Sequence, residues 1–142
     1  MNAKEFLSRA WLIEKQVQSK QEQIEVLKSL ACRVTAGAGT EPVVHTRNVT
    51  SMQDTIVRIL EAEEELNRRI DELVSMKLEV MQVVDQVKDV TLRLILEKRY
   101  LSFLSWERIS VDLGYTVRWT LIRHEEALRT VQELLDELGD FT

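Results

Sequence analysis

The sequence has few residues that break helices or form covalent cross-links. It contains one proline and four glycines in 142 residues, so few positions favour a turn over a continuing helix. The single cysteine, Cys32, excludes an internal disulfide and fits a reducing cytoplasm. We interpret Cys32 as a small apolar residue near the end of a helix. Because good helix formers such as Glu, Lys, Leu, Gln and Arg are abundant, the sequence predicts an all-α protein.

Long apolar runs and an excess of positive charge are also missing. No run approaches the roughly 20 apolar residues of a membrane span. The N-terminus lacks the basic stretch and hydrophobic core of a signal peptide, so a cytoplasmic protein without membrane contact is expected. The net charge of −5 argues against a non-specific nucleic-acid coat, which needs positive charge to displace counterions. DNA binding would therefore need the help of a partner or a dimer.

No motif for catalysis or for a cofactor is present. The sequence contains no GxGxxG, P-loop or GxSxG pattern. His45 has no cysteine or carboxylate at metal-ligand spacing. The acidic run at 61–65 is interpreted as a solvated helix face whose partners are Arg68 and Arg69. The prediction is a protein that is not an enzyme and that uses no metal or cofactor.

Two long heptad patterns occupy the first 88 residues. Apolar residues recur in alternating steps of three and four, which predicts helices over about 3–33 and 51–86. Asn2 is the expected N-cap of the first helix, and Ser51 that of the second. The glycine-containing segment 35–50 is the expected flexible connector.

These two helices predict an antiparallel hairpin or coiled coil over residues 1–88. Self-association in trans fits the same pattern equally well. Because a two-helix seam makes a thin core, we expect a homodimer or docking on the C-terminal part.

Residues 89–142 form the second expected domain. Asp89 is placed to cap a third helix over about 90–101. Ser105 is a plausible N-cap of a short helix, and Gly114 follows where a helix end favours a left-handed residue. Thr116 then caps a last, longer helix. A helix, a three-residue turn with glycine and a second helix form the helix-turn-helix pattern.

This C-terminal stretch resembles region 4 of sigma-70-type factors. The similar residues are those at 99–101, 104–110, 113–116 and 127–128. The whole chain is similar to a family of unknown function from phages and prophages of Gram-positive bacteria, whose helix-turn-helix contains an Arg-Trp pair, here Arg118-Trp119. Members of that family usually carry basic or polar residues after the tryptophan, whereas this chain has the neutral run 120–122. The resemblance implies a late-gene transcription regulator that binds double-stranded DNA.

The last helix has two faces of different chemistry. His124 lies on the apolar side and is interpreted as a core histidine with a satisfied hydrogen bond. The residues expected to meet DNA are Thr116, Arg118, Trp119, Ile122 and Arg123, with Arg108 holding a phosphate. The structural alternative is that Trp119 packs under the N-terminal hairpin.

Three functions remain open from the sequence. The leading interpretation is a sequence-specific phage transcription regulator whose hairpin supplies dimerisation or contact with RNA polymerase. The second is a DNA-packaging adaptor like a small terminase subunit, which would assemble as a ring. The third is a protein-only binder of a host factor, since helix-turn-helix modules also dock on proteins.

Overall fold

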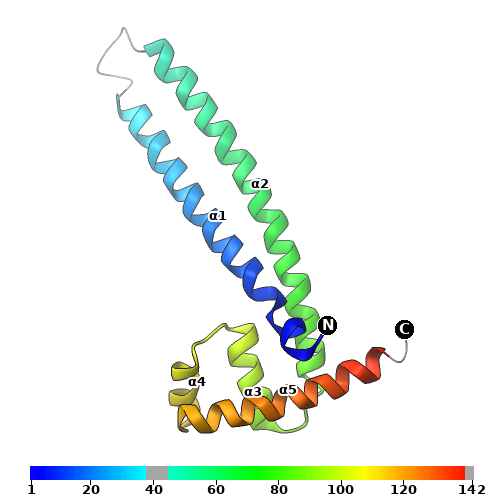
Figure 1. Ribbon diagram of the computed structural model, residues 1–142. Coiled ribbons are helices and arrows are strands. Elements are labelled where there is room, and N and C mark those ends of the chain that lie inside the picture. The colour runs from blue at the N-terminus through cyan, green and yellow to red at the C-terminus, as the bar shows by residue number, and fades with distance from the viewer. Residues whose placement is uncertain (38–44, 140–142) are drawn as a thin grey trace. The chain divides into compact units, whose positions relative to one another are not determined.

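The computed structural model describes the backbone of residues 1–37 and 45–139 and the side chains of residues 1–33 and 51–139 (Figure 1). All secondary structure within these ranges is helical, which confirms the all-α prediction. The elements are α1 (Ala3–Gly37), α2 (His45–Val84), α3 (Val90–Leu96), the π-helical turn η2 (Glu97–Leu101), α4 (Trp106–Leu113) and α5 (Val117–Gly139). None of the described helices is both long and apolar enough to cross a bilayer.

The chain divides into two compact units. Unit 1 comprises Met1–Ile13 and Leu73–Thr142, and unit 2 comprises Glu14–Glu72. Both boundaries lie inside long helices, so α1 and α2 contribute to each unit. This division differs from the sequence-based boundary at residue 88. The reason is that the first turns of α1 and the last turns of α2 bury their apolar side chains with α3 and α5.

Unit 2 is a pair of helical segments joined as an antiparallel hairpin. In Figure 1 the α1 and α2 segments of this unit run side by side. Val17 and Ile24 of α1 are buried in the seam, and Lys28 Nζ lies 3.7 Å from Glu63 Oε1 on α2. Only these two apolar side chains of unit 2 are buried among its described residues, so its core is as thin as the heptad pattern predicts.

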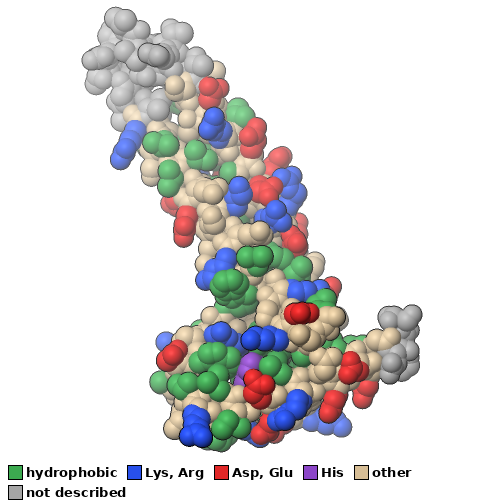
Figure 2. Space-filling model, viewed as in Figure 1, with side chains coloured by type: hydrophobic (Ala, Val, Ile, Leu, Met, Phe, Trp, Pro, Cys, Tyr) green, Lys and Arg blue, Asp and Glu red, His purple; other side chains and the backbone are tan. Residues whose placement is uncertain are grey.

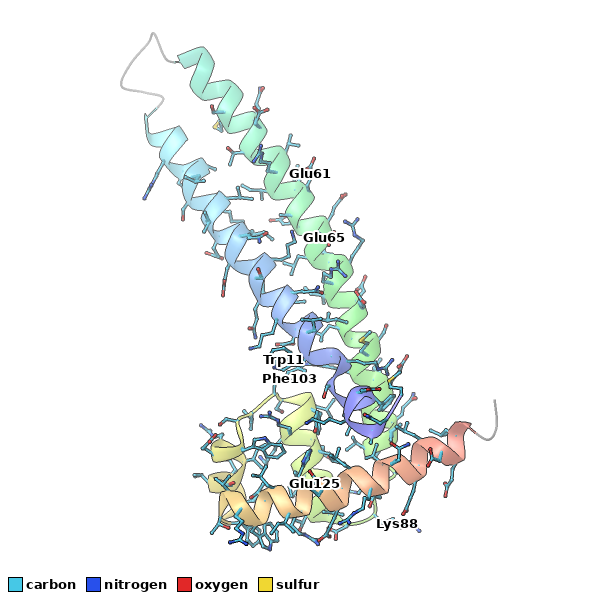
Figure 3. All side chains as sticks on the ribbon, in the orientation of Figure 1. Trp11, Glu61, Glu65, Lys88, Phe103 and Glu125 are labelled. Carbon is cyan, nitrogen blue, oxygen red and sulfur yellow. The ribbon has the colours of Figure 1, made fainter. Side chains whose placement is uncertain are left out.

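Charged side chains of both signs cover unit 2. Acidic and basic groups are interspersed in the space-filling view (Figure 2). Glu65 Oε1 lies 3.2 Å from Arg69 Nε, and Arg68 hydrogen-bonds the other oxygen of Glu65, whose position is marked in Figure 3. The hydrogen bond from Arg68 is the main reason that the pKa of Glu65 lies below its usual value. Within the described ranges no three His, Cys, Asp or Glu side chains are placed to hold a metal ion.

The long helices extend beyond their predicted ends. α1 continues to Gly37 and α2 already begins at His45, so part of the expected connector 35–50 is helical, while residues 38–44 lie outside the described ranges. Ser51 is therefore wrong as an N-cap, since it lies inside α2 and its carbonyl accepts from the Thr55 hydroxyl. No glycine or proline at 45–50 stops the helix from starting earlier.

The interpretation of Cys32 as a small apolar residue packed near a helix end is also wrong, because Cys32 is exposed.

Unit 1 holds the larger core. It is built from the start of α1, the end of α2 and the C-terminal helices. The buried residues are Ala3, Leu7, Val80, Val83, Val84, Val87, Leu92, Leu96, Tyr100, Ala127 and Val131. A continuous cluster of this size holds α3 and α5 against each other and gives α5 a fixed base.

Two predicted helix caps of unit 1 are confirmed. The Asn2 side chain accepts from the Glu5 N–H at 2.8 Å, and the Glu5 carboxylate accepts from the Asn2 N–H at 3.2 Å. The Asp89 side chain accepts from the N–H groups of Thr91 and Leu92 at the start of α3.

The third predicted helix changes character in its second half. α3 ends at Leu96, and the next five residues form the π-helical turn η2 instead of a further α-helical turn. The Ser102 N–H donates to the Glu97 carbonyl at 3.1 Å, which is the i to i−5 spacing of a π turn. The predicted third helix over 90–101 therefore has the expected ends, but its last five residues are π-helical instead of α-helical.

Candidate nucleic-acid interface

The predicted bend between α4 and α5 is present. The Ser105 hydroxyl accepts from the Arg108 N–H at 3.2 Å and begins α4. Gly114 ends α4 with φ 77° and ψ 30°, and its N–H donates to the Ser110 and Val111 carbonyls. The Thr116 hydroxyl then accepts from the Trp119 N–H at 3.1 Å and begins α5. Local chemistry at three positions therefore fixes where one helix stops and the next starts.

Gly114→Ala should destabilise the protein by about 1–2 kcal/mol. A Cβ at this position would meet no atom within 4 Å, so the effect is the backbone strain of a left-handed non-glycine residue. Urea unfolding followed by tryptophan fluorescence measures it, because Trp11, Trp106 and Trp119 all belong to unit 1. Gly139→Ala is the matched control, with an equally open site but an ordinary helical φ. Equal effects of the two substitutions would contradict the role of the turn.

Buried hydroxyl groups connect α4 to the first turn of α5. Ser110 and Thr120 are both nearly inaccessible, and their hydroxyl oxygens lie 3.0 Å apart. The Thr120 hydroxyl also donates to the Thr116 carbonyl at 2.9 Å. Because buried polar groups without partners are costly, this pairing favours one arrangement of the two helices. Sequence reasoning placed Thr120 on the buried side but did not find its partner.

An aromatic cluster lies beneath the first half of α5. His124 is buried, its Nε2 lies 2.6 Å from the Tyr100 hydroxyl, and its ring packs edge-on against Trp106 at 4.5 Å. The prediction of a core histidine with a satisfied hydrogen bond is confirmed. Burial, followed by the positive charges of Arg99 and Lys4, lowers the pKa of His124 from 6.5 to about 4. Burial likewise raises the pKa of Tyr100 to about 12.

The outward face of α5 carries Arg118 and Ile122 one turn apart. Ile122 is 53% exposed, and Arg118 is also exposed. The Arg118 guanidinium has no ion pair or hydrogen bond within the described part of the chain. We call these two residues the outer ridge. A free guanidinium beside an exposed apolar side chain is the combination that reads guanine edges and thymine methyls in a major groove.

Trp119 packs along its own helix. Its ring stacks on that of Tyr115, with centroids 3.6 Å apart, and the Arg123 guanidinium lies 5.6 Å from the ring centre on the other side. Tyr115 belongs to the turn before α5, and Trp119 and Arg123 lie one turn apart on α5 itself. Trp119 is therefore half-buried beside the outer ridge. If this face met DNA, Trp119 would contact it with the edge of its ring.

Arg123 is held by two carboxylates. Its guanidinium lies 3.0 Å from Asp89 Oδ2 and also pairs with Glu126. The Leu92 N–H, and then the charge of Arg123, keep the pKa of Asp89 below its usual value. Asp89 therefore caps α3 and also ties it to α5. An arginine neutralised in this way is poorly placed to contact DNA, although the sequence pattern grouped it with Arg118.

Arg108 lies on the exposed surface of α4. Its Nε is 3.2 Å from Asp112 Oδ1, and Lys98 Nζ is 3.7 Å from the other oxygen of the same carboxylate. The Arg108 side chain is 68% exposed, and a pair in that setting contributes little to stability. A phosphate can therefore compete with Asp112 for this guanidinium.

Of the six expected site residues, Arg123 is paired with Asp89 and Glu126, and the other five are placed as follows. Arg118 and Ile122 form the outer ridge, and Thr116 starts their helix as a cap. Trp119 lies beside the ridge, and Arg108 lies on the neighbouring helix. Sequence reasoning missed Asp89 as the partner of residue 123, because 34 residues separate the two and no local pattern links them.

Comparison with protein families, with curated proteins and with solved structures found no match to this chain.

Proposed function

We propose that the α4–α5 module binds double-stranded DNA in a sequence-specific way, as part of a phage transcription regulator in the cytoplasm of a bacterial host. The outer ridge enters the major groove, and Arg108 contacts the phosphate backbone. The hairpin of unit 2 serves for homodimer formation or for contact with RNA polymerase.

The observation that supports the proposal best is the unpaired Arg118. Arg108 and Arg123 of the module pair with carboxylates, whereas Arg118 and, further along α5, Arg129 have no ion pair or hydrogen bond among the described residues. Arg118 stands within the first turn of a helix whose start is fixed by the Thr116 cap. The N-terminal turn of the second helix is the part that reaches base edges in helix-turn-helix proteins.

Charge limits how strongly the module can bind DNA. Residues 93–129 hold seven Lys and Arg against five Asp and Glu, a net charge of +2 in a chain of net charge −5. Few phosphates can be neutralised by so small an excess, so affinity should depend weakly on salt. Dimer formation would double the number of contacts, which is why the proposal includes a homodimer or a polymerase partner.

Arg118→Ala should weaken binding to a preferred duplex about tenfold or more, because a bidentate arginine–guanine contact contributes roughly 1–3 kcal/mol. The duplex is obtained by repeated selection from a random-sequence library with the full-length protein. Binding is then measured by fluorescence anisotropy at several salt concentrations.

Arg129→Ala is the matched control for this experiment. Arg129 is also an exposed arginine of α5, and it follows Arg118 by eleven residues, close to three whole helical turns. Its substitution removes the same charge and should change affinity less than about threefold. Equal losses in both variants would mean that charge alone attracts DNA. Absence of any selected duplex, or unchanged binding by Arg118→Ala, would refute DNA reading.

The exposed apolar residues around the turn favour a protein partner as the second candidate function. Val111 is 77% exposed, Ile122 is 53% exposed and Tyr115 is 48% exposed. Exposed apolar side chains that form a patch often mark a contact with another protein. If Ile122→Asp abolishes co-purification of RNA polymerase while no duplex is ever selected, the protein-only function replaces the first.

A further inference from the structure

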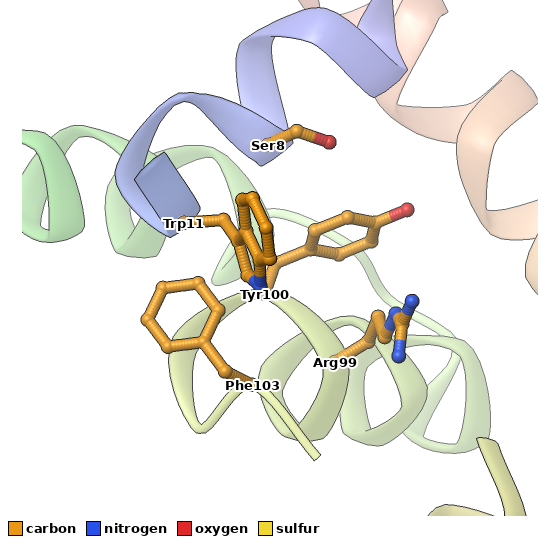
Figure 4. Close-up of a pocket in the computed structure, with 5 residues that line it drawn as sticks. All are labelled: Ser8, Trp11, Arg99, Tyr100 and Phe103. Atoms are coloured by element: carbon orange, nitrogen blue, oxygen red, sulfur yellow. The ribbon is translucent and has the colours of Figure 1, made fainter. Parts of the chain in front are cut away.

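A small cavity in unit 1 is lined by aromatic side chains from distant parts of the chain. It has a volume of ≈200 Å³, and its walls are Ser8, Trp11, Arg99, Tyr100 and Phe103. Figure 4 shows the rings of Trp11, Tyr100 and Phe103 grouped together, with Arg99 on the side of Tyr100. The cavity has room for about one aromatic ring, since a dry cavity of roughly 150 Å³ already holds benzene in another protein.

The backbone at Phe103 is in a conformation that bulky residues rarely adopt. Its φ is +56°, and it is the one non-glycine residue with positive φ among those described. A left-handed conformation strains a residue with a Cβ by roughly 1–2 kcal/mol, and glycine would adopt it without strain. A phenylalanine at this position places a ring in the cavity wall at the expense of stability. Strain of this kind is often found at binding sites.

The turn before Phe103 is equally unusual. The π-helical turn η2 carries Arg99 and Tyr100, two further walls of the cavity. Leu104 N–H closes the segment by donating to the Lys98 carbonyl at 3.0 Å, across six residues instead of the usual four or five. Single π turns in helices occur frequently at functional sites. The positive φ at Phe103 and the π-helical turn η2 therefore border the same cavity.

The charges at the cavity favour an anion. The Arg99 guanidinium is oriented by the Leu104 carbonyl at 3.0 Å and by the Trp106 ring at 4.6 Å, but it has no carboxylate partner in the described chain. Lys77 Nζ lies 5.1 Å from the centre of the Phe103 ring. An oriented arginine is well suited to bind a carboxylate by charge-assisted hydrogen bonds. Cation binding would be opposed by the positive charge of Arg99.

We propose that this cavity binds a small aromatic carboxylate, with the ring among Trp11, Tyr100 and Phe103 and the carboxylate on Arg99. The ring size follows from the volume, and the negative charge follows from a guanidinium that has a carbonyl and an aromatic ring as partners but no carboxylate among the described residues. This inference does not depend on DNA binding, because the outer ridge of α5 contributes no residue to the cavity.

The test is a titration of the isotopically labelled full-length protein with sodium benzoate, followed by NMR. Benzoate should give saturable shifts at the Trp11 indole N–H and at the amides of Arg99 and Phe103. A dissociation constant of about a millimolar is expected for a ligand with so few atoms. Benzylamine should bind at least about tenfold more weakly, because its ring carries a positive charge. Acetate, which has no ring, should give no saturable shift.

Two variants test the two halves of the site. Arg99→Gln should lower benzoate affinity about tenfold but leave the affinity for benzyl alcohol unchanged, since only the charged contact is lost. Arg129→Gln, an exposed arginine outside the cavity, is the matched control and should change neither affinity. Phe103→Gly should weaken both ligands about tenfold, yet it should leave the protein at least as stable, because glycine tolerates the φ of +56°.

Three results would overturn the proposal. The first is the absence of saturable shifts with benzoate. The second is benzylamine binding as tightly as benzoate, which would exclude an anion site. The third is unchanged benzoate binding in Phe103→Gly, which would place the ligand elsewhere.

Discussion

Acidification from pH 6.5 to about 4 is expected to destabilise unit 1 by roughly 2–3 kcal/mol through His124 alone. Burial lowers the pKa of this residue from 6.5 to about 4, so the folded chain keeps it neutral over that range. In the unfolded chain the imidazole binds a proton as soon as the pH falls below 6.5. The unfolded state then binds more protons than the folded state, and stability falls with pH by at most about 1.4 kcal/mol per pH unit.

The main physical reason is burial, which removes water from around the imidazole and so disfavours its charged form. His124 is bonded to the Tyr100 hydroxyl, and burial keeps that phenol protonated by raising its pKa to about 12. Arg99 and Lys4 add positive potential at the same ring. Above pH 6.5 this contribution of His124 is fully present, and below about pH 4 it is lost and changes no further.

The measurement is urea unfolding by tryptophan fluorescence at intervals between pH 7.5 and pH 4. Carboxylates also titrate in this range, so the informative quantity is the difference from His124→Gln, which retains all of them. That variant should show a clearly shallower loss of stability below pH 6.5. Parallel curves for the two proteins would show that His124 ionises in the folded state as readily as in the unfolded state.

Leu96→Ala is expected to destabilise unit 1 by about 2–5 kcal/mol. Leu96 is 0% exposed and packs in the cluster that holds α3 against α5. Truncation removes its transfer free energy and leaves a cavity that the surrounding helices only partly fill.

Leu138→Ala is the matched control, since Leu138 is a leucine of α5 that is 45% exposed. Its substitution should change the free energy of unfolding by well under about 1 kcal/mol. The two variants are compared by urea unfolding at pH 7.5, with tryptophan fluorescence as the probe. A loss of less than about 1 kcal/mol in Leu96→Ala would be incompatible with the packing described for this core.

Features decided by neighbouring residues could be predicted from the sequence. Asn2, Asp89 and Ser105 were each identified as caps. A short polar side chain just before a helical pattern of apolar residues can accept a hydrogen bond from a free N–H group of the first turn. Gly114 was predicted to end the preceding helix, because the residue at that position often adopts a left-handed backbone conformation, which glycine does without strain. His124 was assigned to the core because its spacing matched the apolar face of α5.

Features decided by contacts between distant residues could not be predicted. Nothing in the local sequence around Asp89 indicates that its carboxylate also pairs with Arg123. Ser51 looked like a helix start, but the preceding residues continue the helix, since a capping residue permits an end without requiring one. The cavity was missed altogether, because Trp11 lies about 90 residues from its other aromatic walls.

For the candidate interface, the sequence pattern grouped the arginines of the last helix together and gave them equal weight. Helical periodicity places Arg118 and Arg123 outward or at the flank, and it cannot report that two carboxylates hold only the second of them. It likewise predicted Trp119 to face away from the core, but not its stacking on Tyr115. Pair contacts of this kind depend on side-chain conformations that periodicity does not contain.

The π turn at Glu97–Leu101 also affects how the chain compares with other sequences. A π turn contains one residue more than the α-helical turn that it replaces, so it corresponds to a single-residue insertion. Relatives that lack this insertion would align with the chain only through a one-residue gap at 97–101. Without that gap, every position from Ser102 onward would be compared with the wrong residue of such a relative.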